Sequence, residues 1–158
     1  MARQSVYVET TIVSYLTGRP SRDLVVAGKQ QVTADWWETE RHGYDLFVSE
    51  FVAKEAAEDD PEAAERRSQC LAGIAFVEAN PDVATLAEAL LIEGVLPEKA
   101  ATDAVHIALA TVHGIDFLLT WNCKHLANAR IRDAVNRVLV ERGYEPPIIC
   151  TPDELMGE

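Results

Sequence analysis

Basic side chains are scarce in this sequence. Of its 158 residues, 14 are lysine or arginine and 26 are aspartate or glutamate, so the formal net charge is -12 at pH 7. Such an acidic chain opposes non-specific attraction to nucleic acid and to anionic membranes, because their phosphates carry the same sign of charge. Any contact with phosphate must therefore depend on a few basic side chains gathered in one place.

Cysteine is also rare, and its pattern argues against two classes of small domain. The three cysteines, Cys70, Cys123 and Cys150, are an odd number and include no C-x-x-C pair. This arrangement suggests neither a disulfide framework nor a structural zinc site. We expect all three cysteines to be reduced and structural.

Long hydrophobic runs are absent as well. No apolar segment approaches the roughly 20 residues that cross a bilayer. The first residues, MARQSVYVETT, also lack the apolar core of a signal peptide. We therefore expect a cytoplasmic protein that does not bind a membrane.

The sequence contains no internal repeat, low-complexity tract or linker. Its length of 158 residues is that of one ordinary domain, so we assign a single domain to 1–158. Helical patterns alternate with five strand candidates, at 5–8, 44–49, 74–77, 117–119 and 148–150. Such alternation favours an α/β sandwich with a mostly parallel central sheet flanked by helices.

The most informative stretch begins at Pro97 and leads into the fourth predicted strand. Pro97 suits the first position of a helix, Gly114 suits its end, and apolar residues recur between them at helical spacing. One residue does not fit this apolar pattern, the carboxylate Asp103. An acid near a helix N-terminus interacts favourably with the helix dipole, which is worth about 0.3 to 1 kcal/mol. Alternatively, Asp103 faces a cleft where further acids and a divalent cation meet.

Candidate partners for Asp103 follow other predicted strands. Glu9 lies where the first strand gives way to a helical pattern, at the kind of strand end where ligands usually bind in a parallel sheet. Glu55 lies in the helical pattern after the second strand and could be either solvated or directed back over the strand end. Asn122 lies just beyond the fourth strand. These side chains would meet at one edge of the sheet.

Candidates for phosphate contacts are few. Arg19 and Arg22 lie in the loop GRPSRD, and Lys124 follows the fourth strand. An ordinary surface role is the alternative for each of them. Thr10 can cap the first helix with its hydroxyl, and it is also a candidate substrate contact.

Taken together, these patterns resemble the PIN domain, the fold of the VapC-like toxins of bacterial toxin-antitoxin pairs. The resemblance covers nearly the whole chain and rests on the segments VYVETTIVSYL, SEFVAKE and ATDAVHIALATVHGIDFLLTWN. It implies a PIN-like three-layer sandwich and a ribonuclease that hydrolyses RNA with Mg²⁺ or Mn²⁺. It also implies a homodimer and a cognate antitoxin with a basic tail. The implied catalytic residues are Glu9, Glu55, Asp103 and Asn122, of which the three acids would be the metal ligands.

The sequence departs from the family pattern at two positions. Glu9 replaces the usual aspartate, which keeps the charge and extends its reach by one methylene. Asn122 replaces an acid and offers an oxygen without a charge, so the site should hold a cation less tightly. His106 and His125 could compensate as phosphate contacts or proton donors. A hydrogen-bonded core position for His106 and a surface position for His125 are the simpler expectations.

The second departure raises an alternative function. A PIN-like domain with three carboxylates could be catalytically weak or inactive and act as a module that binds RNA or a protein. A phospho-accepting signalling domain shares the topology, but it needs an aspartate at the end of the third strand, where this sequence has Glu78, Ala79 and Asn80. A metal-dependent ribonuclease is therefore the first hypothesis.

Overall fold

A parallel sheet of five strands forms the centre of the molecule. The structure is a computed structural model that describes residues 3–157. Its strands are β1 (Ser5–Val8), β2 (Asp45–Val48), β3 (Ala75–Phe76), β4 (Phe117–Leu119) and β5 (Ile148–Cys150). They lie in the order β3-β2-β1-β4-β5, and each neighbouring pair is parallel. The predicted α/β architecture is confirmed, and the predicted strands differ from the observed ones by at most one residue at each end.

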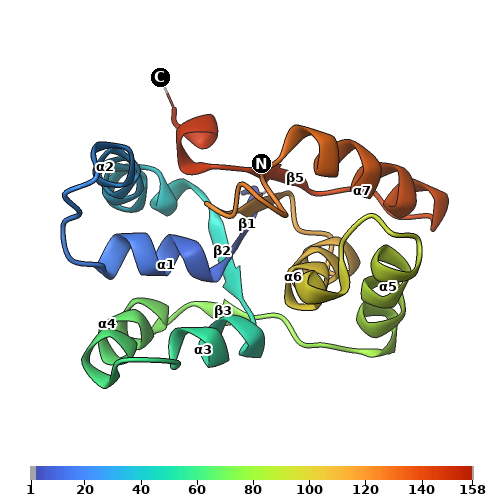
Figure 1. Cartoon of the computed structure of the whole chain (residues 1–158), viewed down its shortest axis with the longest axis horizontal. Coiled ribbons are helices and arrows are strands. Elements are labelled where there is room, and N and C mark those ends of the chain that lie inside the picture. Colours follow the sequence, from blue (N-terminus) through green and yellow to red (C-terminus); the bar gives the residue numbers. More distant parts are fainter. Residues whose placement is uncertain (1–2, 158) are drawn as a thin grey trace.

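Helices cover both faces of the sheet, which gives three layers (Figure 1). One outer layer contains α1 (Thr10–Thr17), α2 (Leu24–Thr39) and α4 (Pro61–Leu71), and the short α3 (Glu50–Ala56) packs against α1 and α4. The other contains α5 (Pro81–Ile92), α6 (Ala101–Val112) and α7 (Ala129–Glu141). None of the helices within 3–157 is both long enough and apolar enough to cross a bilayer.

Most residues of β1 and β4 are buried because helices cover both faces of these strands. Val6, Tyr7 and Val8 of β1 and Leu118 and Leu119 of β4 have no exposed surface. Such continuous apolar runs are typical of parallel strands, since neither face meets water. This buried centre fixes where β1 and β4 end and therefore where the residues after them lie.

The helix predicted from Pro97 begins slightly later than the pattern suggested. Pro97 precedes a 3-10 turn, Glu98–Ala100, and the α-helix α6 starts at Ala101. The helix ends as predicted, because Gly114 adopts a positive φ of 67° that other residues rarely take. Asp103 consequently lies in the first turn of α6.

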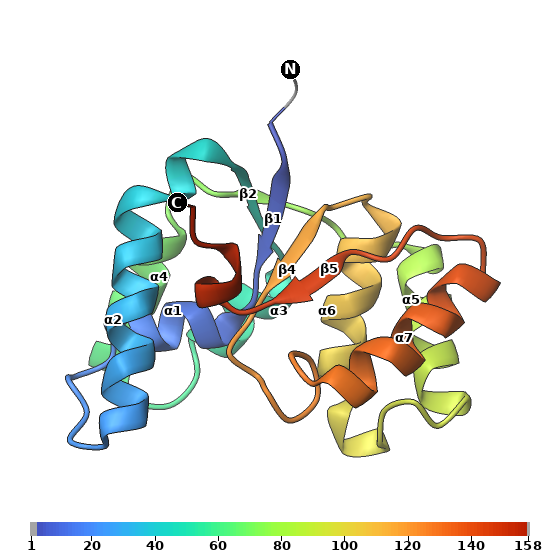
Figure 2. The ribbon, with the colours of Figure 1, turned by 90° about the horizontal axis from the view of Figure 1, so that it is seen from above.

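The strand order reverses beside β1. From this central strand, β2 and β3 lie on one side and β4 and β5 on the other, as the view from above also shows (Figure 2). In parallel sheets, ligands bind outside the carboxyl ends of the strands at the point where the strand order reverses. Here that point lies between the ends of β1 and β4.

A candidate metal centre at the carboxyl edge of the sheet

Glu9 follows β1 directly and is buried at the start of α1, where it is 3% exposed. Its carboxylate caps the helix by accepting the Thr11 N–H at 3.2 Å. It also accepts the hydroxyls of Thr11 and Thr120, each at 2.5 Å. Thr120 lies just beyond β4, which pairs with β1. Two neighbouring strand ends therefore hold this carboxylate in place.

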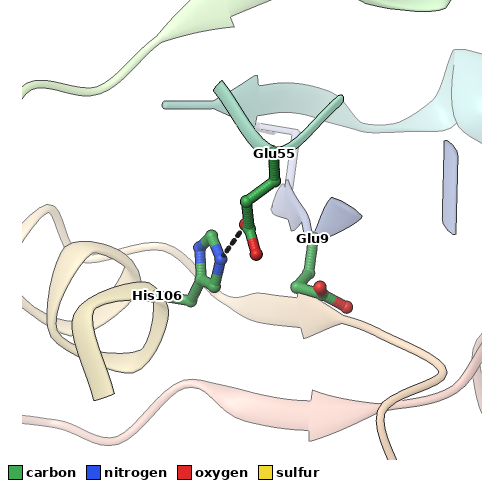
Figure 3. A group of neighbouring side chains, drawn as sticks. All are labelled: Glu9, Glu55 and His106. Atoms are coloured by element: carbon green, nitrogen blue, oxygen red, sulfur yellow. Dashed lines mark hydrogen bonds and ion pairs between the residues drawn. The ribbon is translucent and has the colours of Figure 1, made fainter. Parts of the chain in front are cut away.

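Glu55 extends from α3 toward the same strand ends. Its Oε1 accepts the Thr10 hydroxyl at 2.8 Å and lies 2.7 Å from His106 Nε2. One ligand atom from each of Glu9, Glu55 and His106 lies within 4.8 Å of the others (Figure 3). The Glu55 side chain is 33% exposed. The sequence left two orientations of Glu55 open, and in the structure its side chain is directed back over the strand end.

Asp103 forms a second group with Asn122 and His125. Its Oδ1 accepts the Asn122 Nδ2 at 3.1 Å, and its Oδ2 lies 3.2 Å from His125 Nδ1. The loop after β4 turns back at this point, because Asn122 Oδ1 accepts the His125 N–H at 3.0 Å. His125 is consequently a largely covered partner of Asp103 and not the surface residue that the sequence suggested.

Hydrogen bonds connect the two groups. The backbone N–H of Asn122 donates at 2.9 Å to the Thr120 hydroxyl, which in turn donates to Glu9. Asp103 is outside the group of ligand atoms that lie within 4.8 Å of one another, and it reaches Glu9 through this chain. Glu9, Glu55, Asp103 and Asn122 thus all lie at the carboxyl edge of the sheet.

Several solved structures share this architecture. VapBC2 of Rickettsia felis, bound to a DNA fragment from its promoter, aligns with a TM-score of 0.60 at 11% identity over 94% of this chain and 98% of that chain. VapC20 of Mycobacterium tuberculosis, a toxin that cleaves the sarcin-ricin loop, aligns with a TM-score of 0.59 at 15% identity over 75% of this chain and 91% of that chain. A toxin-antitoxin complex from Klebsiella pneumoniae aligns with a TM-score of 0.54 at 20% identity over 75% of this chain and 88% of that chain.

The chain has a PIN-like fold. The fold that the sequence motifs implied is thereby confirmed. No protein-family model matches the sequence, and no curated protein matches it either. Since the identities are 11 to 20%, the likeness is one of fold.

Burial changes the pKa of each acid at this edge of the PIN-like sheet. Burial raises the pKa of Glu9 despite its hydroxyl partners and the charge of His106. Burial likewise raises the pKa of Asp103, against the charges of His106 and His125. For Glu55, burial is outweighed by the hydrogen bond and charge of His106 and by Thr10, so its pKa lies below the usual value. Two of the three acids are therefore costly to ionise unless a cation is added.

These pKa directions predict how stability depends on pH in the presence of a chelator. An acid whose pKa is raised by folding stabilises the protein at low pH, and this contribution is lost as the pH rises through the folded-state pKa. We expect the free energy of unfolding, measured with urea, to fall from pH 5.5 to pH 8. The contribution of Glu9 is about 1.4 kcal/mol for each unit by which its pKa is raised.

The Glu9→Gln variant isolates this contribution, because its side chain does not titrate. Its unfolding free energy should fall less between the two pH values than that of the unsubstituted protein. Glu88→Gln, at an exposed position of α5, is the matched control and should keep the original slope. If the unfolding free energy of Glu9→Gln fell with pH as steeply as that of the unsubstituted protein, the buried carboxylate of Glu9 would not be the source of the pH dependence.

The donor set of this PIN-like site fits a hard divalent cation. Within residues 3–157, no lysine or arginine forms an ion pair with Glu9, Glu55 or Asp103. Clustered carboxylates repel one another, and Mg²⁺ and Mn²⁺ prefer oxygen ligands. His106 is not free to act as a ligand, because one ring nitrogen contacts Glu55 and the other contacts the Tyr7 hydroxyl at 2.7 Å. The expected hydrogen-bonded core position of His106 is confirmed.

The predicted substrate contacts occupy different environments. Arg19 and Arg22 are exposed in the loop between α1 and α2, and Lys124 is exposed after β4. Thr10 is buried, and its hydroxyl donates to Glu55. The hydroxyl of Thr10 is therefore engaged in orienting an acid.

The sequence interpretation missed three residues that support the site. Thr120 and Thr11 orient Glu9, and Tyr7 contacts His106. Thr120 offers a sequence signal, since it ends a buried strand two residues before Asn122. For Tyr7 there is none, because an aromatic residue within an apolar strand predicts only core packing.

Proposed function

We propose that this protein is an endoribonuclease that hydrolyses RNA phosphodiesters with Mg²⁺ or Mn²⁺ held by Glu9, Glu55 and Asp103. The observation that carries the proposal is the closeness of Glu9 and Glu55 at the carboxyl edge of a PIN-like sheet. Asp103 is linked to Glu9 through Asn122 and Thr120, and no lysine or arginine within 3–157 pairs with these acids. Cleavage of the sarcin-ricin loop by the similarly folded VapC20 supports it by analogy of fold.

The residues of this chain would orient the ligands before a cation arrives. When bound, the cation would lower the pKa of a water molecule and offset charge on the phosphoryl oxygens. Pre-oriented carboxylates lose little side-chain entropy on binding. Each acid has two side-chain partners: Thr11 and Thr120 for Glu9, Thr10 and His106 for Glu55, and Asn122 and His125 for Asp103.

We further propose that exposed cations guide the RNA to this edge. Lys124 lies two residues beyond Asn122, and Arg19 and Arg22 lie past the far end of α1, the helix that begins next to Glu9. These side chains would contact phosphates and oppose the repulsion from a chain with a net charge of -12.

A cognate antitoxin is the proposed protein partner, and a homodimer in the cytoplasm is the proposed state. The neighbour from Klebsiella pneumoniae is a toxin-antitoxin complex. A net charge of -12 suits a partner segment that is basic, because opposite charges favour encounter and register.

The proposal predicts metal-dependent cleavage of RNA by the purified chain. A labelled mixture of RNAs is incubated with Mn²⁺, with Mg²⁺ and with a chelator, and the products are separated on a denaturing gel. We expect cleavage with Mn²⁺ or Mg²⁺ and none with the chelator, because the acids alone supply no Lewis acid.

The alternative function, a PIN-like module that binds without cleaving, is favoured by one observation, the amide of Asn122 in place of an acid. It predicts that the folded protein retains RNA or protein binding but leaves the labelled RNA intact with either cation. That outcome, with circular dichroism confirming the fold, would exclude the nuclease.

A further inference from the structure

Four polar side chains form a buried chain of hydrogen bonds that ends at Glu55. Ser49 Oγ lies 2.7 Å from Tyr7 Oη, Tyr7 Oη lies 2.7 Å from His106 Nδ1, and His106 Nε2 lies 2.7 Å from Glu55 Oε1. Ser49, Tyr7 and His106 have no exposed surface. Buried polar groups are costly unless they are paired, so each link helps to hold the next in one orientation.

The first and last residues of this hydrogen-bonded chain, Ser49 and Glu55, both belong to α3 or its cap. Ser49 is the N-cap of α3, and its hydroxyl accepts the Val52 N–H at 3.4 Å. Glu55 lies in the last turn of the same helix. Tyr7 comes from β1 and His106 from α6, so two other elements of the fold anchor both ends of this short helix. A helix of this length has little stability of its own, and such anchors fix its direction.

The hydrogen-bond donor between His106 and Glu55 can be assigned from the chemistry of the groups. An ionised Glu55 only accepts hydrogen bonds, so Nε2 of His106 carries a proton. With Nδ1 as an acceptor, the Tyr7 hydroxyl donates to it and accepts the Ser49 hydroxyl; with a proton on Nδ1, both bonds run the other way. In both arrangements the two nitrogens of His106 are occupied.

Glu55 has an oxygen left over. Its Oε1 contacts Thr10 and His106, while its Oε2 accepts no hydrogen bond from residues 3–157. The side chain reaches the surface at this point, and Glu9 lies nearby (Figure 3). The buried chain thus ends in a carboxylate with one oxygen held and one oxygen open.

We propose that His106 is a positioning residue for the cation site, and that Tyr7 fixes His106 for this role. His106 holds Oε1 of Glu55 so that Oε2 faces the cation, and it does not bind the cation itself. This inference rests on the proposed function, since it assumes that Glu55 is a ligand. In this proposal His106 Nε2, the ring nitrogen near Glu9 and Glu55, forms a hydrogen bond with Glu55 and does not coordinate the metal.

Mn²⁺ binding measured by calorimetry tests this role without reference to catalysis. Loss of a partner that orients a metal ligand typically weakens metal affinity about 10- to 100-fold, and we expect this of His106→Leu. His106→Gln keeps a donor near the Nε2 position and should stay within about threefold of the unsubstituted protein. Tyr7→Phe removes one hydroxyl and should weaken binding about 3- to 10-fold.

Matched controls and a spectroscopic measurement separate positioning from other roles. Tyr44→Phe and His42→Leu make the same chemical changes at the opposite end of β2 and should leave Mn²⁺ affinity unchanged. Electron spin-echo spectra of the Mn²⁺ complex should show no directly bound nitrogen from His106. A directly bound nitrogen signal that disappears in His106→Gln would identify a ligand and overturn the proposal.

The outcomes also separate this proposal from the proposed function. If the unsubstituted protein binds Mn²⁺ no better than Glu9→Gln does, the metal site itself is refuted, and the positioning role with it. If it binds Mn²⁺ and folded His106→Leu binds equally well, only the positioning role is refuted. Should His106→Leu fail to fold, Tyr7→Phe decides, because affinity equal to that of Tyr44→Phe would overturn the proposal.

Discussion

Asp103→Asn is expected to reduce Mn²⁺-dependent RNA cleavage at least about 100-fold. A pair of unit charges 4 Å apart contributes about 4 kcal/mol at an effective dielectric constant near 20. Since each 1.36 kcal/mol changes a rate tenfold, losing one of three negative charges around a divalent cation is enough for this reduction. The measurement is the initial rate of cleavage of one labelled RNA at fixed Mn²⁺ concentration.

The fold should survive this substitution, so the loss can be attributed to the charge. An asparagine at this position can still accept the Asn122 Nδ2 with its carbonyl oxygen and can donate to His125. Asp133→Asn is the matched control, because Asp133 is exposed on α7 and its ion pair within 3–157 is with Arg137 on the same helix. Cleavage by Asp103→Asn at the rate of the control would refute the role of Asp103.

Asn122→Asp is expected to lower stability without the cation and to recover about 1.4 kcal/mol of that loss when the cation is in excess. The amide of Asn122 donates to Asp103, whereas an aspartate would lose that hydrogen bond and repel Asp103. With a chelator present, the free energy of unfolding should therefore fall by about 1 to 3 kcal/mol. A fourth carboxylate should also bind Mn²⁺ about tenfold more tightly, so added Mn²⁺ should stabilise the variant more than the original protein.

Thermal or urea unfolding, with a chelator and with Mn²⁺, measures the loss of stability without the cation and the stabilisation that the cation adds. A free Mn²⁺ concentration of 100 times the dissociation constant stabilises the folded state by about 2.7 kcal/mol, and a site tenfold tighter gains about 4.1 kcal/mol at the same concentration, so the difference is measurable. Asn136→Asp, at an exposed position of α7, is the control and should gain as much stability from Mn²⁺ as the original protein does. An Asn122→Asp variant that Mn²⁺ stabilises no more than this control would place position 122 outside the cation site.

Much of the fold could be predicted from the sequence because its strands are buried on both faces. Val6 to Val8 and Phe117 to Leu119 are apolar without interruption, and the helical patterns between the strands carry caps such as Asp23, Ser49 and Asn80. These signals are local, since they depend on the chemistry of a few adjacent residues. The position of each strand end, and therefore of Glu9 and Asn122, follows from them.

The partners of each acid could not be predicted in the same way. His125 binds Asp103 because the loop after β4 turns back, and Tyr7 of β1 meets His106 of α6 in the buried core. These contacts span 22 and 99 residues along the chain, and nothing in either neighbourhood indicates the other. Whether Glu55 faced solvent or the sheet also depended on His106, which lies 51 residues away.

The sequence by itself determined the order of strands and helices along the chain, because hydrophobic burial repeats with the period of each element. It thereby also determined that an acid follows a strand or lies on a neighbouring helix. Only the tertiary structure decided which side chains orient those acids and which carboxylate oxygen stays open. That information lies in the packing of separate elements, where hydrogen bonds depend on distances of a few tenths of an ångström that no local pattern records.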